Sequence, residues 1–160
     1  MSTVRILVFS DSHGNTRNII PALEAQTDAR HALFLGDGAA KFMELASAFP
    51  NISFRAVSGN CDREDDLPLF RVLDIAGKRI YMTHGHGEGV KYSLGTLMKN
   101  ALVNRADIVI YGHTHISRIS YENSLHIINP GSVSQPRAGR PSYAVIDITA
   151  GGVAPFIVEL

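Results

Sequence analysis

The sequence predicts an α/β fold in which two β-sheets pack together and helices cover their outer faces. Strand-like and helix-like segments alternate over the first third of the 160-residue chain, which is typical of a parallel sheet. The part after residue 68 is rich in strand-like segments and contains one helix-like segment. A chain of this length can bury a core of its own, so we expect residues 1–160 to form one domain.

The first three predicted strands span 4–10, 31–35 and 52–57. Each is a short run of apolar and β-branched residues that ends in Gly, Asp, Asn or Ser, the residues that favour turns. Helix-like segments occupy the two intervals between them. This order and spacing predict a parallel βαβαβ unit.

Two helices are predicted between these strands. The first begins with Asn15 or Thr16 as its cap and runs to about Gln26, and Pro21 lies early enough in it to be tolerated. The second spans 41–49, where apolar residues recur on one helical face. We expect both helices to lie outside the sheet.

The second half is predicted to consist of paired strands around one helix. Segments 70–75 and 79–83 flank the turn residues 76–78 and form a hairpin. A helix with an apolar stripe is predicted from Ser93 to about Arg105. The remaining predicted strands are 108–111, 116–122 and 125–128, the last two paired across Asn123-Ser124, and 143–148 and 153–158, paired across Gly151-Gly152.

Composition and charge restrict the class of protein. Lys and Arg together equal Asp and Glu in number, so no basic field predicts binding to a nucleic-acid polymer or a membrane. The single cysteine, Cys61, cannot form an internal disulfide, which is typical of a reducing compartment. The N-terminus lacks a signal-peptide pattern, and no apolar run approaches the roughly 20 residues of a membrane span. We therefore expect a cytoplasmic protein.

Side chains that bind metal ions follow five of the predicted strands, at the point where each strand ends. Any one of these clusters alone is an ordinary polar turn. Because ligand crevices in open sheets lie at the carboxyl ends of the strands, the five clusters together predict one metal site. The candidate ligands are Asp11, His13, Asp37, Asn60, His84, His113 and His115. In extended backbone, His113 and His115 would point toward a common space.

The number and charge of these ligands indicate the chemistry. Seven ligands are too many for one tetrahedral ion, and they suit two ions roughly 3.5–4 Å apart that share a carboxylate. Asp11 and Asp37 neutralise only part of the charge of two divalent ions, and the other ligands are neutral. The site therefore keeps a net positive charge and can hold a hydroxide and an anionic phosphate, which favours phosphoester hydrolysis over a calcium cage built from carboxylates.

These residues occur in five blocks whose order resembles that of the calcineurin-like metallophosphoesterases. The blocks are Asp11-x-His13, Gly36-Asp37, Gly59-Asn60-x-Asp62, His84 and Gly112-His113-x-His115. The short chain and the run Asn-Pro-Gly-Ser at 129–132 most resemble the small phosphodiesterase branch of that family found in bacteria and archaea. The resemblance implies a two-sheet αββα sandwich of the metallophosphoesterase type, which agrees with the fold expected from the sequence pattern.

The resemblance also implies how the ligands are divided. One ion would be bound by Asp11, His13, Asp37 and His115, and the second by Asp37, as a bridge, with Asn60, His84 and His113. A hydroxide that bridges the two metals would attack phosphorus in line with the leaving oxygen. The mixture of nitrogen and oxygen ligands favours transition metals over magnesium, with manganese as first choice and iron, zinc, cobalt or nickel as alternatives.

The chain departs from the family pattern at Cys61. Many relatives carry a histidine there that protonates the leaving oxygen, and a thiol is a poorer match to that role. Asp62 or His86 could replace it, so the candidate catalytic residues are Asn60, Asp62 and His86. Alternatively, the enzyme acts on esters whose leaving groups need little protonation.

Three functions stay open. The leading one is a dinuclear metal-dependent phosphodiesterase that acts on small or activated phosphodiesters. The same site could instead hydrolyse phosphomonoesters or nucleotides, because no long insertion forms a cap over the substrate. A non-catalytic scaffold like the retromer subunit of this fold is the alternative from another class, although here the ligand set is complete. The apolar C-terminal strand also leaves a homo-dimer open.

Overall fold

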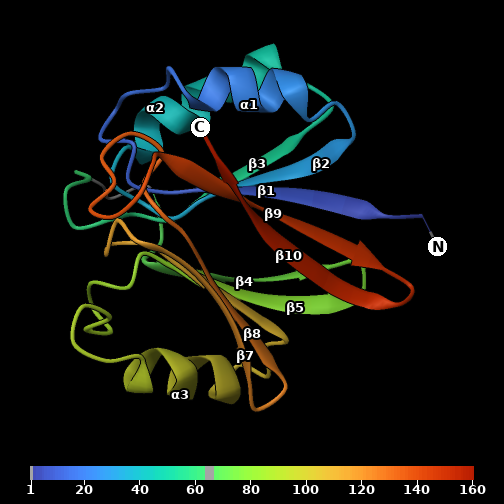
Figure 1. Ribbon diagram of the computed structural model, residues 1–160, viewed down its shortest axis with the longest axis vertical. Coiled ribbons are helices and arrows are strands. Elements are labelled where there is room, and N and C mark those ends of the chain that lie inside the picture. Colours follow the sequence, from blue (N-terminus) through green and yellow to red (C-terminus); the bar gives the residue numbers. More distant parts are fainter. Residues whose placement is uncertain (1, 64–66) are drawn as a thin grey trace.

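Two five-stranded β-sheets lie face to face, and helices cover the outer face of each (Figure 1). The computed structural model describes residues 2–63 and 67–160. Helices α1 (Ile19–Ala25) and α2 (Ala39–Glu44), the latter followed by the 3-10 helix η1 (Leu45–Ala48), cover the first sheet, and α3 (Gly95–Val103) covers the second. The arrangement is the αββα sandwich that the sequence predicts.

The first sheet is built on three parallel strands. Its order is β10-β9-β1-β2-β3, with β1 (Val4–Phe9), β2 (Ala29–Phe34), β3 (Ser53–Ala56), β9 (Ser142–Thr149) and β10 (Gly152–Glu159). β1 pairs in parallel with β2, and β2 with β3, which confirms the predicted βαβαβ unit. β9 and β10 form an antiparallel hairpin beside β1. Because β1, β2 and β3 run the same way, their carboxyl ends lie at one edge of the sheet.

The second sheet contains a parallel pairing that the sequence pattern does not reveal. Its order is β4-β5-β6-β8-β7, with β4 (Phe70–Ile75), β5 (Lys78–Thr83), β6 (Ile108–Tyr111), β7 (Ser117–Glu122) and β8 (Leu125–Pro130). The hairpins β4–β5 and β7–β8 are antiparallel, as predicted. β8 also lies beside β6 and runs parallel to it, and β6 runs parallel to β5. Three parallel strands therefore end at one edge of this sheet too.

The core has three layers, and the alternation of side chains along β1 connects two of them. Ile6 and Val8 point toward the second sheet and pack in the apolar cluster between the sheets. Leu7 and Phe9 point the other way and pack in the cluster beneath α1 and α2. A third cluster lies between the second sheet and α3. Full burial of one such side chain contributes about 1.5–3 kcal/mol, so both faces of β1 help to hold the layers together.

The helices differ from their predicted bounds at their first turns. Asn15 is not a helix cap, because its side-chain oxygen accepts a hydrogen bond from the amide of Arg17 in a turn. A further turn, from the Ile19 amide to the Thr16 carbonyl, precedes α1. α2 begins before the predicted 41–49, and its last part continues as η1. No helix of the described ranges is long and apolar enough to cross a membrane.

An ion pair joins β1 and β9 across the first sheet. Arg5 and Asp147 are opposite each other in the register, and the guanidinium donates two hydrogen bonds of 2.8 Å to the carboxylate. The hydrogen bond from Arg5 is the main reason that the pKa of Asp147 is lowered. The pair is partly shielded from water, since the Asp147 side chain is 16% exposed.

We expect Asp147→Asn to destabilise the fold by about 1 kcal/mol at neutral pH, because it removes the charge from this paired geometry. Since the folded-state pKa is lowered, the stabilisation is present above the ordinary carboxyl pKa of 3.8 and is lost as the pH falls through the lowered value. Denaturant unfolding at neutral and acidic pH measures both effects. Asp74→Asn is the control, because Asp74 pairs with Arg79 in the same way but is 66% exposed. Equal losses in the two variants would contradict this prediction.

Candidate metal centre

The predicted ligands meet at the edge where the parallel strands of both sheets end. Loops follow β1, β2, β3, β5 and β6 there, and they gather on the left side of Figure 1. The residues that these loops contribute are Asp11, His13, Asp37, Asn60, His84, His113 and His115. Four of them are buried and form the floor of the site, namely Asp11, Asp37, His84 and His115. The other three are half-buried or exposed and form its rim.

The ligand atoms form two adjoining groups. Asp11, His13 and His115 offer atoms that all lie within 4.8 Å of one another, and so do Asp37, His84 and His113. Each group draws side chains from both sheets. The groups adjoin because the Nε2 atom of His84 lies 3.3 Å from an Asp37 oxygen and 3.8 Å from an Asp11 oxygen. The structure thus brings together residues that are up to about a hundred positions apart in the sequence.

Asn60 and Asp37 extend these groups. The side-chain oxygen of Asn60 lies 3.0 Å from Nε2 of His84, so Asn60 lies beside the second group. Asp37 also lies within 4.8 Å of His13 and Cys61, which places its carboxylate between the two groups. This position is the one expected of a bridging ligand.

Hydrogen bonds at Nδ1 orient two histidines so that their Nε2 atoms face the cluster. Nδ1 of His84 donates to the carbonyl of Leu35, and Nδ1 of His115 donates to the carbonyl of Gln135, each over 2.7 Å. Nε2 of each ring then points into the cluster. Burial opposes a charge on His84, but Asp37 and Asp11 raise its pKa, and Asp11 raises the pKa of His115, so without metal a proton on Nε2 can balance the carboxylates. Histidines that bind metals are oriented in the same way by a hydrogen bond from the other ring nitrogen.

Asp11 supplies the test of whether these residues fit metal ions. Its Oδ2 atom accepts hydrogen bonds from the Ser10 hydroxyl and the His113 amide. Its Oδ1 atom is buried and has no hydrogen-bond partner among the described residues. Nε2 of His115 lies 3.2 Å from that oxygen without meeting the geometry of a hydrogen bond. A buried, unpaired carboxylate oxygen facing imidazole nitrogens fits a divalent cation.

Electrostatics keep the second group ready to bind a cation. Burial alone would raise the pKa of Asp37, but the hydrogen bond and charge of His84 hold it well below its ordinary value. Burial, and then the positive charges of His84 and Lys91, lower the pKa of His113 to about 4. Asp37 is therefore ionised and His113 is neutral near pH 7, which are the protonation states that metal binding requires.

Backbone strain is concentrated at the ligands. Nine non-glycine residues of the described ranges have positive φ, and five of these are predicted ligands: Asp11 (56°), His13 (50°), Asp37 (62°), His113 (73°) and His115 (59°). Such a conformation is uncommon for residues with a side chain and occurs mainly at functional sites. The expectation of extended backbone at His113 and His115 is wrong, and the two side chains belong to different groups.

Two glycines are required by close packing against the ligands. A Cβ atom on Gly59 would collide with the Asp37 carboxylate, and one on Gly112 would collide with the Ser10 hydroxyl. A larger residue at either position must displace an acidic ligand or its partner. The Gly-Asn and Gly-His blocks of the sequence therefore have a steric cause.

Asp62 holds the site loops in place instead of facing the reaction. Its two oxygens accept hydrogen bonds from four backbone amides, those of Asp37, Gly38, Ala39 and Gly59. An ionised carboxylate offers about four acceptor positions, and all four are used here. A proton on either oxygen would oppose one of these donors. The structure thus gives Asp62 a positioning role, in place of the proton-donor role considered from the sequence.

His86 and Cys61 lie beside the groups without belonging to the predicted ligand set. The His86 ring centre is 5.4 Å from that of His84 and 6.1 Å from that of His113. Cys61 is exposed, and its sulfur lies within 4.8 Å of ligand atoms of His13 and Asp37. Burial and the neighbouring carboxylates raise the pKa of the Cys61 thiol, which does not favour it as a proton donor.

Several residues that support the site were missed from the sequence. The Ser132 hydroxyl donates to the carbonyl of Asp11, and the Ser134 hydroxyl donates to that of Ser12. The side-chain amide of Asn129 donates to the carbonyl of Gly112. The signal available was the polar run 129–134 directly after an apolar strand, but its targets are backbone atoms on other strands. No residue type identifies such targets.

Known proteins share this sequence pattern and fold. A family model described as a calcineurin-like phosphoesterase superfamily domain matches residues 4–151. Phosphodiesterase YfcE from Escherichia coli (strain K12) is 31% identical over 169 residues, which cover 90% of this chain and 88% of that protein. A predicted phosphoesterase from Streptococcus pneumoniae TIGR4 has a TM-score of 0.79 and 26% identity, with 99% of both chains covered. Vacuolar Protein Sorting 29 from Cryptosporidium parvum has a TM-score of 0.77 at 19% identity over 99% and 98% of the chains, a likeness of fold alone.

We expect Asp62→Asn to destabilise the protein by about 1–3 kcal/mol and to weaken its affinity for divalent metal, because an amide group would face amides that already donate. Denaturant unfolding and titration with Mn²⁺ measure the two effects. Asp28→Asn is the matched control, since the Asp28 side chain is 70% exposed. Unchanged stability and metal affinity in Asp62→Asn would show that the four amide contacts do not hold the site.

Proposed function

Because the chain belongs to the calcineurin-like phosphoesterase superfamily, we propose that it is a metal-dependent phosphodiesterase that hydrolyses small or activated phosphodiesters. The observation that carries the proposal is the pair of adjoining ligand groups, with a buried and unpaired Asp11 oxygen between imidazoles. When bound, two divalent ions would supply a hydroxide held between them and would neutralise charge on the phosphoryl oxygens.

The side chains divide this work by position. Asp11 with His13 and His115 would hold one ion, and His84 with His113 and Asn60 the other, with Asp37 shared between them. Nitrogen and oxygen ligands in this proportion favour manganese, with iron, zinc, cobalt or nickel as alternatives. Only two carboxylates face up to four positive charges, so the site would attract an anionic ester.

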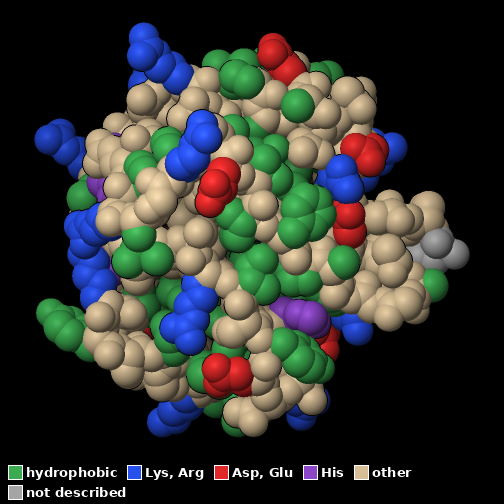
Figure 2. Space-filling view, viewed as in Figure 1, with side chains coloured by type: hydrophobic (Ala, Val, Ile, Leu, Met, Phe, Trp, Pro, Cys, Tyr) green, Lys and Arg blue, Asp and Glu red, His purple; other side chains and the backbone are tan. Residues whose placement is uncertain are grey.

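The surroundings of the site also favour an anionic substrate. The positive charges of Lys91 and Arg137 oppose protonation of His113 and His115, respectively, so both cations add to the positive potential at the site. Lys and Arg side chains gather along the left margin of Figure 2, the side where the site loops lie in Figure 1. Although the chain has no net charge, its local field can therefore draw a small phosphoester toward the ligands.

Two other functions remain as candidates, one on the same ligands and one without catalysis. Phosphomonoester or nucleotide hydrolysis would use the same ligands and differs only in the substrate, whereas the Escherichia coli relative described above is a phosphodiesterase. A scaffold of the retromer-subunit type fits the structural likeness to Vacuolar Protein Sorting 29. The identity to Phosphodiesterase YfcE is 31%, against 19% to Vacuolar Protein Sorting 29, so we favour an enzyme.

Among the candidate catalytic residues, we favour His86 as the acid that protonates the leaving oxygen. Asn60 is taken up by the second ligand group, and both Asp62 oxygens accept amide hydrogens. The Nδ1 atom of His86 is buried without a hydrogen-bond partner among the described residues, and its ring lies beside His84. Burial, and then the charge of His84, lower the pKa of His86, so its protonated form is a stronger acid than ordinary imidazolium.

We expect the Mn²⁺-loaded protein to hydrolyse bis-p-nitrophenyl phosphate faster than p-nitrophenyl phosphate, and a chelator to abolish both activities until metal is restored. Asp37→Ala should lower the rate of hydrolysis by more than the roughly 10–100-fold that is typical when a residue hydrogen-bonded to a metal ligand is lost, because it would weaken the binding of both ions. Release of p-nitrophenolate is the measurement, with exposed Asp74→Ala as the control. Activity that ignores chelation would refute the metal-dependent site, and faster monoester hydrolysis would favour the second candidate.

We expect His86→Asn to slow the hydrolysis of diphenyl phosphate by about 100-fold and that of bis-p-nitrophenyl phosphate by much less, because p-nitrophenolate leaves without protonation. His126→Asn is the matched control, since His126 lies on β8 against the tilted ring of Tyr121 and not among the candidate ligands. The measurement is kcat for each substrate. Equal slowing of both substrates would mean that His86 does not act as the acid.

A further inference from the structure

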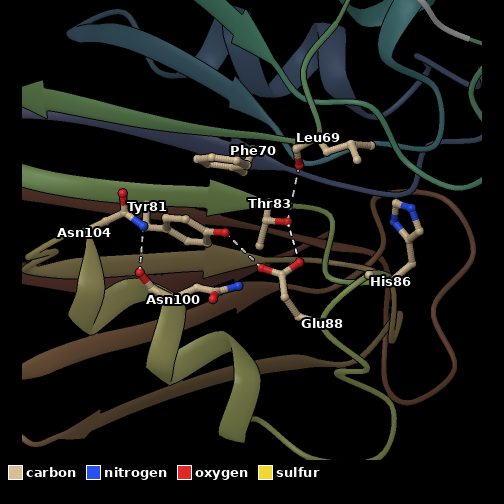
Figure 3. Close-up of a pocket in the computed structure, with 9 residues that line it drawn as sticks. Leu69, Phe70, Tyr81, Thr83, His86, Glu88, Asn100 and Asn104 are labelled. Atoms are coloured by element: carbon tan, nitrogen blue, oxygen red, sulfur yellow. Dashed lines mark hydrogen bonds between the residues drawn. The ribbon is translucent and has the colours of Figure 1, made fainter.

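A cavity of about 330 Å³ lies next to the metal-ligand cluster and is not used by the ligands. It is enclosed by the start of β4, the end of β5, the loop that follows β5, and α3 (Figure 3). The residues that define it are Leu69, Phe70, Tyr81, His86, Glu88 and Asn100. Its size lies at the lower end of the range for small-molecule sites and suits one ring-sized group.

One wall of the cavity is apolar and aromatic. Phe70 stacks on Tyr81 with ring centres 5.4 Å apart and planes 22° from parallel, as Figure 3 shows from the side. Phe70 is 49% exposed and its neighbour Leu69 is 62% exposed, although both are large and apolar. Exposed apolar side chains beside a cavity are typical of a binding surface. A planar ring could stack or pack on this wall.

The wall that adjoins the Tyr81 hydroxyl is polar and negatively charged. The Glu88 carboxylate accepts hydrogen bonds from the Tyr81 hydroxyl, 3.1 Å away, and from the Thr83 hydroxyl, 2.9 Å away. The side chain of Asn100 reaches the same wall from α3 (Figure 3). A carboxylate held in this way repels anions, so the cavity does not suit a phosphate group. It suits an uncharged group that is flat and partly polar.

The cavity is joined to the metal-ligand cluster through two residues. His86 lines the cavity, and its ring centre lies 5.4 Å from that of the ligand His84. Thr83, which also lines the cavity, directly precedes His84 in the chain. A group covalently attached to a phosphate at the ligands can therefore reach the cavity within the length of one ester bond and one ring.

We propose that this cavity binds the alcohol part of the phosphoester, and that it favours an uncharged alcohol carrying an aryl or heterocyclic ring. The proposal rests on the proposed function, because it takes the ligand cluster as the place where the phosphate binds. It narrows the substrate class, since small alkyl diesters would leave the aromatic wall exposed and esters with anionic alcohols would meet Glu88.

The test compares two non-hydrolysable ligands that differ only in the ring. Methylphosphonate and phenylphosphonate are titrated calorimetrically into the Mn²⁺-loaded protein. The phenyl compound should bind about tenfold more tightly, as expected for one stacked ring. In Phe70→Ala this ratio of Kd values should fall to about twofold or less, while the Kd of methylphosphonate stays unchanged. Tyr121→Ala is the matched control, because Tyr121 is an exposed aromatic residue on β7 and should leave the ratio unchanged.

A charged ring tests the role of Glu88. In the wild-type protein, 4-carboxyphenylphosphonate should bind no more tightly than methylphosphonate. In Glu88→Gln, it should again bind more tightly than methylphosphonate. Equal binding of methyl- and phenylphosphonate, binding of neither, or a ratio that survives Phe70→Ala would overturn the proposal. Tighter binding of the phenyl compound without hydrolysis of either nitrophenyl ester would contradict the proposed function, and only the binding of a ring in the cavity would stand. Hydrolysis without ring preference would remove only the cavity assignment.

Discussion

The structure depends on the charge balance of two buried carboxylates among imidazole nitrogens. Asp11 and Asp37 lie at the bottom of the site, where water cannot compensate their charge, and an oxygen of Asp11 has no hydrogen-bond partner in the described part of the chain. The imidazoles of His84 and His115 turn their Nε2 atoms toward them, because their Nδ1 atoms donate to backbone carbonyls. Two buried carboxylates need a positive charge beside them, which protonated imidazole supplies without metal and a divalent cation would supply when bound, and this is why we regard the site as suited to metal.

The rest of the fold positions that assembly. Parallel strands from two sheets end at one edge, so short loops suffice to bring residues from distant parts of the chain into contact. The loops adopt strained backbone at the candidate ligands. They are held there by hydrogen bonds that the Ser132 and Ser134 hydroxyls donate and that the Asp62 carboxylate accepts. Close packing at Gly59 and Gly112 leaves the acidic groups only one position. Rigidity of this kind keeps the geometry of a reactive site before the substrate arrives.

Much of this was accessible from the sequence, for identifiable reasons. Strand 70–75 matches its predicted bounds, because apolar residues and turn residues define it locally. The side chains predicted as ligands do lie together, because five strands in one chain rarely all end in metal-binding side chains unless those side chains share a site. The start of α1 was misplaced, since Asn15 makes a local turn that competes with a cap. The role of Asp62 and the cavity behind His86 depend on where backbone amides and distant elements lie, and no residue pattern encodes that.

The composition of the two ligand groups has a consequence for the folded state itself. Asp11 and His13 follow a strand of the first sheet, whereas His115 follows a strand of the second, and the other group is divided in the same way. An ion in either group would therefore act as a cross-link between the layers of the sandwich, at the edge where loops alone connect them. A protein that binds metal in this way would gain stability from the ion as well as activity, because the ion binds only the folded state.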